Sequence, residues 1–336
     1  MTLTQTAQLT KRLILLSIVV LFLGIGGRIG YNLWEDYRLA QLPPTVEKPE
    51  MKFGPLPKIT FPDPKVSSTN FSYSLDTSTG GFPESLNLIR VYFIPQASIS
   101  LLSPEKAKVL AENLGFLTSP EVIDDKTHLF KNSDGGTVEI NIITLNFSYQ
   151  KSENAKTYEE NFNLQSFSTN KATREFKEFL GKINLLPQEL GEGQTKVTIS
   201  QEKIASPSAS ISIWPADINK LKIITANPDR SLVGGEFIPK NSPLDFYQVD
   251  YTFWPIDKTT YSTYPIKTPL EAFENLKSGG GHISLEPKDP QVSITSVYLA
   301  YYQSEIYTPF LQPVFVFEGP NFVGLVPAIK EVEKAN

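Results

Sequence analysis

The chain has 336 residues, of which 40% are hydrophobic and 20% are charged, a composition that fits a folded globular protein and excludes a wholly disordered one. It contains no cysteine, so disulfides, thiol catalysis and an acylated cysteine are excluded. The 36 acidic residues outnumber the 31 basic ones and give a net charge of −5. This balance disfavours nucleic acid as a partner, because binding to phosphates needs clustered Lys and Arg.

The only long apolar run lies at residues 13–25, directly after a basic pair. A helix needs about 20 residues to cross a bilayer, so we predict a transmembrane helix over residues 13–34 and a lipid-bilayer contact there. Within it, Arg28 would extend its charged end to the interface, and two aromatic residues suit the headgroup level. The predicted membrane-interface residues are Lys11, Arg12, Arg28, Tyr31 and Trp34.

The charges on either side of this segment predict its orientation. Lys11 and Arg12 precede it, whereas Glu35 and Asp36 follow it. Because basic flanks stay in the cytoplasm, residues 1–12 are expected to be a cytoplasmic tail of a single-pass cell-membrane protein with an extracytoplasmic C-terminal domain. The alternative is a cleaved signal peptide, although no small-x-small cleavage site follows the apolar core.

A proline-rich segment, residues 41–65, follows the predicted membrane helix. Seven prolines occur between Pro43 and Pro64. Such a composition favours polyproline II structure, with a rise of about 3.1 Å per residue. We therefore predict a semi-rigid stalk that holds the folded part away from the bilayer, with a disordered tether as the alternative.

Strand signals dominate the rest of the chain. Residues 137–149 alternate in hydrophobicity but change phase at Ile143, which predicts one long strand with a bulge or bend. The preceding NSDGG, residues 132–136, predicts a hairpin turn. Further strands are predicted at residues 87–94, 196–200, 292–302, 313–319 and 322–329.

Three short amphipathic helices are predicted among these strands. The first covers about 104–114 with Ser103 as its N-cap, and the second covers about 171–183. The third covers about 269–278 and begins with a capping box formed by Thr268 and Glu271. Helices interspersed among antiparallel hairpins indicate an α+β fold. We expect a β-rich ectodomain in two α+β units, residues 66–190 and 191–336.

Residues that carry chemistry are scarce. The only histidines are His128 and His282, and each is interpreted as structural: the first within a strand, the second after glycines that end a helix. No metal-binding, phosphate-binding or nucleophile motif is present. A Ser–Lys pair or a carboxylate pair would need proximity that a sequence does not reveal, so acids such as Asp124, Asp125 and Glu236 are undistinguished. We therefore expect no catalytic residue, no metal and no cofactor.

Aromatic residues are the remaining candidates for contacts. Exposed aromatic rings bind partner chains or sugars, whereas buried ones fill a core. Adjacent residues of a strand point to opposite sides, so one of Tyr301 and Tyr302 is expected to face outward. The candidate contact residues are Trp214, Trp254, Tyr301 and Tyr302, with a place in the core as the alternative for each.

The stretch from Tyr264 onward carries YPIKTPLEAFENLKSGGGHISL, SITSVYLAYY, LQPVFVFEG and FVGLVPAI. This pattern resembles the C-terminal module of bacterial PepSY-like envelope proteins, which include membrane-anchored extracytoplasmic accessory regulators of a Gram-positive cell-wall histidine kinase. The resemblance covers roughly 65 residues, and it implies a non-enzymatic protein that binds and modulates another membrane or envelope protein.

Two functions follow as expectations. The first is a membrane-anchored, extracytoplasmic interaction or regulatory protein without enzymatic activity. The alternative is a cell-wall glycan-binding module or a hydrolase that uses neither His nor Cys. An apolar patch at a sheet edge would favour the first, and an outward aromatic row beside convergent acids would favour the second.

Overall fold

The computed structural model describes residues 28, 48–63, 66–152, 167–200, 208–241 and 243–330. The chain divides into two compact units, Met1–Lys48 and Pro49–Asn336. Of the predicted transmembrane helix only Arg28 is among the described residues. Within the described part of the chain, no helix combines the length and the apolar character that a bilayer crossing requires. All that follows concerns the unit Pro49–Asn336.

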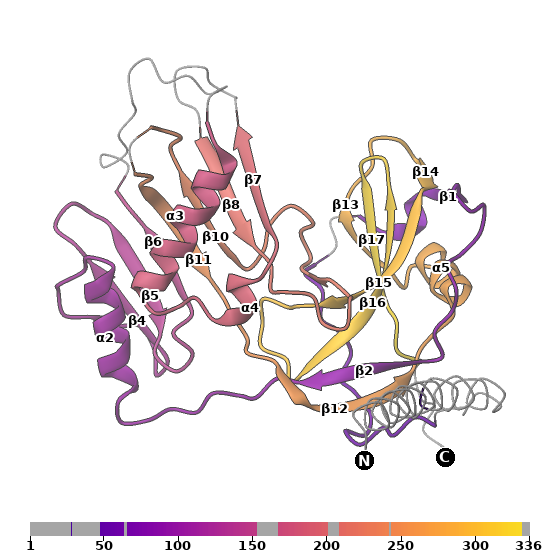
Figure 1. Cartoon of the computed structure of the whole chain (residues 1–336), viewed down its shortest axis with the longest axis horizontal. Coiled ribbons are helices and arrows are strands. Elements are labelled where there is room, and N and C mark those ends of the chain that lie inside the picture. The colour runs from indigo at the N-terminus through magenta and orange to yellow at the C-terminus, as the bar shows by residue number, and fades with distance from the viewer. Residues whose placement is uncertain are drawn as a thin grey trace, which may run out of the picture. The chain divides into compact units, whose positions relative to one another are not determined.

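The predicted α+β class is confirmed, because antiparallel strands dominate and the helices are few and short (Figure 1). One sheet has eight antiparallel strands. In spatial order these are β3 (Glu121–Val122), β4 (Thr127–Lys131), β5 (Thr137–Asn141), β6 (Phe147–Gln150), β11 (Phe246–Tyr251), β10 (Val233–Phe237), β8 (Ser208–Ile213) and β7 (Thr195–Ser200).

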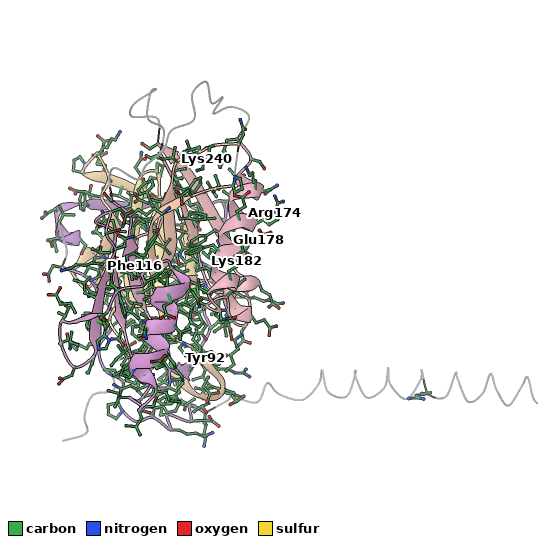
Figure 2. All side chains as sticks on the ribbon, turned by 90° about the vertical axis from the view of Figure 1, so that its left-hand side faces the viewer. Tyr92, Phe116, Arg174, Glu178, Lys182 and Lys240 are labelled. Carbon is green, nitrogen blue, oxygen red and sulfur yellow. The ribbon has the colours of Figure 1, made fainter. Side chains whose placement is uncertain are left out.

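One face of the eight-stranded sheet is covered by α2 (Ser103–Asn113), α3 (Thr169–Lys182) and the short α4 (Gln188–Gly191). Phe176 and Leu180 of α3 are fully buried against strand residues such as Ile211. On the outer side of α3, Arg174 and Glu178 form an exposed ion pair (Figure 2). Apolar residues therefore alternate along these strands, since only one face is dry.

The second sheet is built around β16 (Phe310–Gly319), the longest strand. It runs in the order β12 (Asp257–Pro265), β2 (Leu88–Phe93), β16, β15 (Ser296–Tyr302), β9 (Ile223–Ile224), and β17 (Phe322–Pro327) also pairs with β16 and with β13 (His282–Leu285). β9 pairs in parallel with β15. Beside it lie the helix α5 (Pro269–Lys277), the turn η1 (Ser68–Asn70) and a parallel pair, β1 (Ser72–Leu75) with β14 (Gln291–Ile294).

Both faces of the second sheet are covered. Phe315 and Phe317 of β16 pack with α5 residues on one face, whereas Val314 and Val316 belong to a separate cluster on the other face. That second cluster is covered in part by Ile59 and Phe61, from the predicted stalk. A strand buried on both faces reads as a continuous apolar run, which explains the sequence PVFVF.

Residues 49–63 of the predicted stalk do not stand clear of the folded unit but pack on the second sheet. The Lys52 backbone N–H donates to Ser262 Oγ at 2.8 Å, and the Gln312 side-chain amide donates to the Pro57 carbonyl at 2.8 Å. The Phe53 and Phe310 rings stack with centroids 4.8 Å apart. Apolar side chains between the prolines and free carbonyls explain this docking, because an extended segment can offer both to a sheet. We call residues 49–63 the strap.

All three predicted helices are present, and the capping box of α5 is confirmed by the bond from the Glu271 N–H to Thr268 Oγ1, 3.2 Å. The N-cap prediction at Ser103 is wrong. Ser103 is the first residue of α2, and its hydroxyl instead accepts the Ser100 N–H at 3.0 Å. The helix start is fixed by that preceding turn, which a capping pattern does not reveal.

The turn at residues 132–136 is confirmed, with the Asn132 N–H bonded to the Gly136 carbonyl at 3.0 Å. The single long strand predicted over residues 137–149 is wrong, since β5 and β6 form a hairpin there. Asn141 Oδ1 accepts the N–H groups of Ile143 and Thr144, at 3.0 and 3.1 Å, which closes a turn where the phase of the pattern changes. The predicted unit boundary, before Gly191, falls inside α4, whose last residue is Gly191, and the strands before and after it belong to the same eight-stranded sheet.

Candidate binding site

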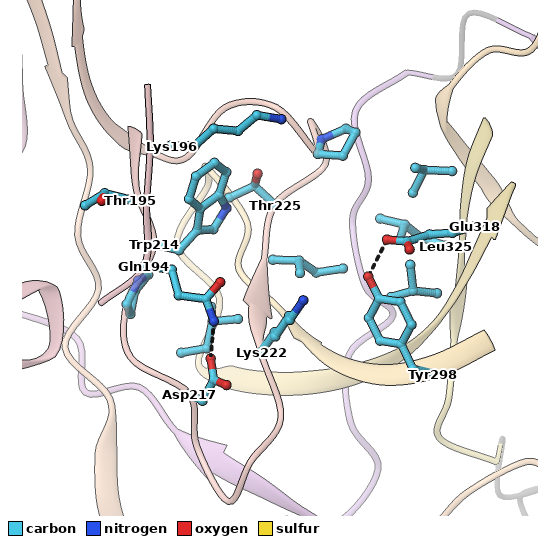
Figure 3. Close-up of a pocket in the computed structure, with 16 residues that line it drawn as sticks. Gln194, Thr195, Lys196, Trp214, Asp217, Lys222, Thr225, Tyr298, Glu318 and Leu325 are labelled. Carbon is cyan, nitrogen blue, oxygen red and sulfur yellow. Dashed lines mark hydrogen bonds between the residues drawn. The ribbon is translucent and has the colours of Figure 1, made fainter. Parts of the chain in front are cut away.

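A pocket of about 360 Å³ lies between the start of β7 in the eight-stranded sheet and the face of the second sheet that the strap covers in part (Figure 3). We call it the Trp214 pocket. Its floor is apolar, and aromatic and charged side chains surround that floor. The lining residues are Gln194, Thr195, Lys196, Trp214, Pro215, Asp217, Lys222, Ile223, Ile224, Thr225, Pro228, Tyr298, Val316, Glu318, Val323 and Leu325.

The floor of the pocket follows from strand alternation. Val316 and Leu325 lie on the strap-side face of β16 and β17, where the strap covers only part of the apolar cluster. Ile224 of β9 adds to the same cluster. Val316 and Leu325 are themselves buried, so the open apolar surface at this end of the sheet comes from the half-buried Ile224 and Val323 above them.

Trp214 is held in place by the turn between α4 and β7. The Trp214 N–H donates to the Gln194 carbonyl at 2.9 Å, and the Ala216 N–H donates to the Glu189 carbonyl at 2.8 Å. A Cβ at Gly193 would lie 1.9 Å from the Trp214 carbonyl oxygen, so only glycine fits there. The indole is thus positioned by backbone contacts and stays half-buried.

Charge is distributed unevenly around the pocket. The Tyr298 hydroxyl donates to Glu318 Oε1 at 2.5 Å, and burial, helped by this carboxylate, raises the pKa of Tyr298 above its usual range. Lys196 pairs with Asp229 at 2.5 Å. Lys222 is exposed, lies 5.9 Å from the centroid of the Tyr298 ring, and has no ion-pair partner among the described residues. Figure 3 shows Lys222 between Trp214 and Tyr298.

A second cavity of about 410 Å³ lies over the polar face of β8, β10 and β11, and Thr225 lines both cavities. Two of its acidic groups are engaged by neighbours: Arg230 Nη2 contacts Glu236 Oε1 at 2.7 Å, and the Ser148 hydroxyl donates to Asp250 Oδ1 at 2.7 Å. No aromatic side chain lines this polar cavity within the described residues. We refer to it as the polar cavity.

The four predicted contact aromatics have different positions. Trp214 lines the pocket. Trp254 is half-buried, and its indole N–H donates to the Ser304 carbonyl at 3.0 Å. Tyr301 and Tyr302 are only 1% and 5% exposed, so the expectation that one of them faces outward is wrong. The reason is the double cover of the second sheet, because strand alternation exposes a side chain only where one face is open.

The two histidines are both buried, His128 on β4 of the eight-stranded sheet and His282 on β13 of the second sheet. His282 is 8% exposed and stacks on Phe61 with ring centroids 5.0 Å apart, and burial lowers its pKa. His128 is buried on β4 beside Phe130. In the described part of the chain, no three His, Cys, Asp or Glu side chains are grouped closely enough to hold a metal ion. Asp124 Oδ1 accepts the Lys126 N–H at 2.7 Å, and this bond lowers its pKa.

Sequence reasoning missed Lys222 and Tyr298, two of the most prominent pocket residues. Tyr298 and Tyr302 are four residues apart in one strand and therefore lie on the same face of the sheet. This spacing is the feature of the sequence that could have identified Tyr298. Lys222 follows a turn that is closed by the Ile218–Leu221 bridge, and no sequence motif predicts that turn. No protein-family model matches the chain, and the comparison with curated proteins gives no significant match.

Proposed function

We propose that this chain is a single-pass, extracytoplasmic membrane protein that binds another membrane or envelope protein through the Trp214 pocket and catalyses no reaction. The membrane anchor in this proposal is the segment 13–34, supported by its apolar composition and flanking charges. The same class of function is implied by the resemblance to PepSY-like envelope proteins. The binding site, however, is argued from the pocket alone.

The observation that carries the proposal is an apolar floor that remains open between two aromatic side chains, Trp214 and Tyr298. Rigid aromatic rings around a desolvated centre are typical of the anchoring positions in protein interfaces. The carboxylate of Glu318 is already bonded to the Tyr298 hydroxyl, so this acid is occupied rather than poised for proton transfer. Recognition is therefore favoured over catalysis at this site.

A glycan site needs an aromatic platform and convergent polar groups in one place. The Trp214 pocket has two acids beside its aromatic rings, but both already accept hydrogen bonds within the protein: Gln194 Nε2 donates to Asp217 Oδ1 at 3.4 Å, and the Tyr298 hydroxyl donates to Glu318. The further acids Glu236 and Asp250 lie in the polar cavity, whose described lining has no aromatic ring. Because the acids beside the rings are engaged, the pocket favours a polypeptide over a sugar chain as the partner.

The test is photo-crosslinking in cells with the full-length protein in its own membrane. A photoreactive amino acid replaces Lys222 in one variant, and Lys182 on the exposed side of α3 in a matched control. We expect one dominant membrane-protein adduct at position 222, none at 182, and a large reduction at 222 when Trp214→Ala is added. Recovery of cell-wall fragments without a protein, or equal adducts at both positions, would contradict the proposal.

A further inference from the structure

Among the strands that the structure describes, none pairs with the outer edge of the eight-stranded sheet beside the Trp214 pocket. The strand order ends at β7, whose one partner among the described strands is β8. In Figure 1, β7 is the strand of its sheet nearest the second sheet. An edge strand offers a row of backbone donors and acceptors to a further chain.

The register shows which groups point to the open edge. Gln194 is opposite Trp214, and its carbonyl accepts the Trp214 N–H, so alternate residues from 194 onward are the hydrogen-bonded positions of the β7–β8 pair. The N–H and C=O groups of Thr195, Val197 and Ile199 therefore point away from β8. The side chains of Val197 and Ile199 pack toward the helix-covered core, so it is their backbone groups that the edge presents.

The pocket lies at the start of this edge. Gln194 precedes β7, Thr195 and Lys196 are its first two residues, and all three line the Trp214 pocket. We propose that the partner binds as an extended strand added to the free edge of β7, with one large apolar side chain in the Trp214 pocket and an acidic side chain beside Lys222. This inference rests on the proposed function, because it names how the partner of that pocket is held.

The chemistry of the pocket selects the side chains. The floor of Ile224, Val316 and Leu325 offers no polar atom, so it accepts an aromatic or aliphatic group. Lys222, which lacks an ion-pair partner among the described residues, supplies the one open positive charge beside it. In such strand addition the main-chain bonds give affinity, and pockets for alternate side chains give specificity.

The experiment compares two substitutions at one edge residue of the full-length protein. Val197→Pro and Val197→Ala both remove the valine side chain, but only proline removes the N–H that points to the open edge. We expect the photo-adduct at position 222 to fall about tenfold in Val197→Pro, which corresponds to roughly 1.4 kcal/mol of binding free energy. The loss reflects one missing hydrogen bond to the partner strand and the steric obstruction by the proline ring. Val197→Ala should keep the adduct, and because both variants carry the photoreactive residue in place of Lys222, the loss of that charge cancels in the comparison.

A second measurement does not depend on the stability of the proline variant. Photoreactive groups at the exposed positions 196 and 198 lie on one face of β7, two residues apart. If a strand is added, the partner residues that they capture are also two apart and lie in an extended segment. Scattered capture sites, or an adduct in a folded Val197→Pro variant as strong as in Val197→Ala, would overturn strand addition. The proposed function would survive that result, since it fails only if position 222 captures no dominant protein.

Discussion

The two sheets differ in how many of their faces are dry. The eight-stranded sheet carries α2, α3 and α4 on one face, and its other face holds the polar cavity. The second sheet is enclosed by α5 on one side and, in part, by the strap on the other. Binding surfaces therefore arise where cover is missing: along the β7 edge of the first sheet, and at the uncovered end of the second.

The same difference predicts how each sheet tolerates substitution. In β16 three consecutive residues, Phe315, Val316 and Phe317, are buried. In β8, Ile211 is buried on the helix-covered face, whereas its neighbours Ser210 and Ser212 line the polar cavity on the other face. Substitutions at adjacent positions should thus both be damaging in the second sheet, whereas in the first sheet only those on the helix-covered face should be.

The largest effect is expected for Phe317→Ala, which removes a fully buried ring beside α5. Such a truncation costs about 3–5 kcal/mol in the free energy of unfolding, because a cavity is left behind. Its neighbour Val316→Ala should also destabilise, by about 2 kcal/mol, whereas Ser210→Ala in β8 should change the value by less than about 0.5 kcal/mol. Urea unfolding of residues 49–336 measures all three. A mild Val316→Ala would show that the strap-side face is not truly enclosed.

A smaller effect is expected at the turn that places Trp214. In Gly193→Ala the new Cβ would clash with the Trp214 carbonyl, and relief of such overpacking costs about 1–3 kcal/mol. Gly191→Ala is the matched control, because a Cβ there meets no atom within 4 Å. The measurement is urea unfolding, combined with the photo-adduct at position 222, which should fall in Gly193→Ala alone. Equal behaviour of the two variants would argue against the close approach at Gly193.

The sequence was informative where the cause is local. The capping box of Thr268 and Glu271 involves neighbours in the chain, and so does the turn at residues 132–136. The sequence was not informative where segments distant in the chain determine whether a side chain is buried. Burial of both Tyr301 and Tyr302 depends on cover over both faces, and Phe61, about 240 residues earlier, supplies part of it at a ring distance of 4.8 Å from Tyr302. The Trp214 pocket combines residues of both sheets, so no single stretch of sequence could reveal it.

The strap supplies a third prediction, since it completes the cover of the second sheet. Phe61→Ala removes a half-buried ring that contacts both Tyr302 and His282, and should lower the free energy of unfolding by about 1–2 kcal/mol, less than a fully buried phenylalanine. Phe61→Leu keeps apolar contact and should lose less. Hydrogen exchange should show faster opening of β13 in Phe61→Ala. No change in stability or exchange would mean that the strap does not hold this face closed.

The smallest effect is a pH dependence at the same contact. Burial lowers the pKa of His282 from its ordinary value of 6.5, so the folded protein resists the proton that the unfolded chain takes up. Above this pH both states hold neutral histidine, and below it the free energy of unfolding falls, by no more than about 1.4 kcal/mol per pH unit for one proton. His282→Phe keeps a ring against Phe61 but cannot titrate, so its stability should fall less between pH 6.5 and pH 5 than that of the unmodified protein. If both lose stability in parallel, His282 is not the group responsible, and the strap-side face is open enough to hydrate a charged imidazole.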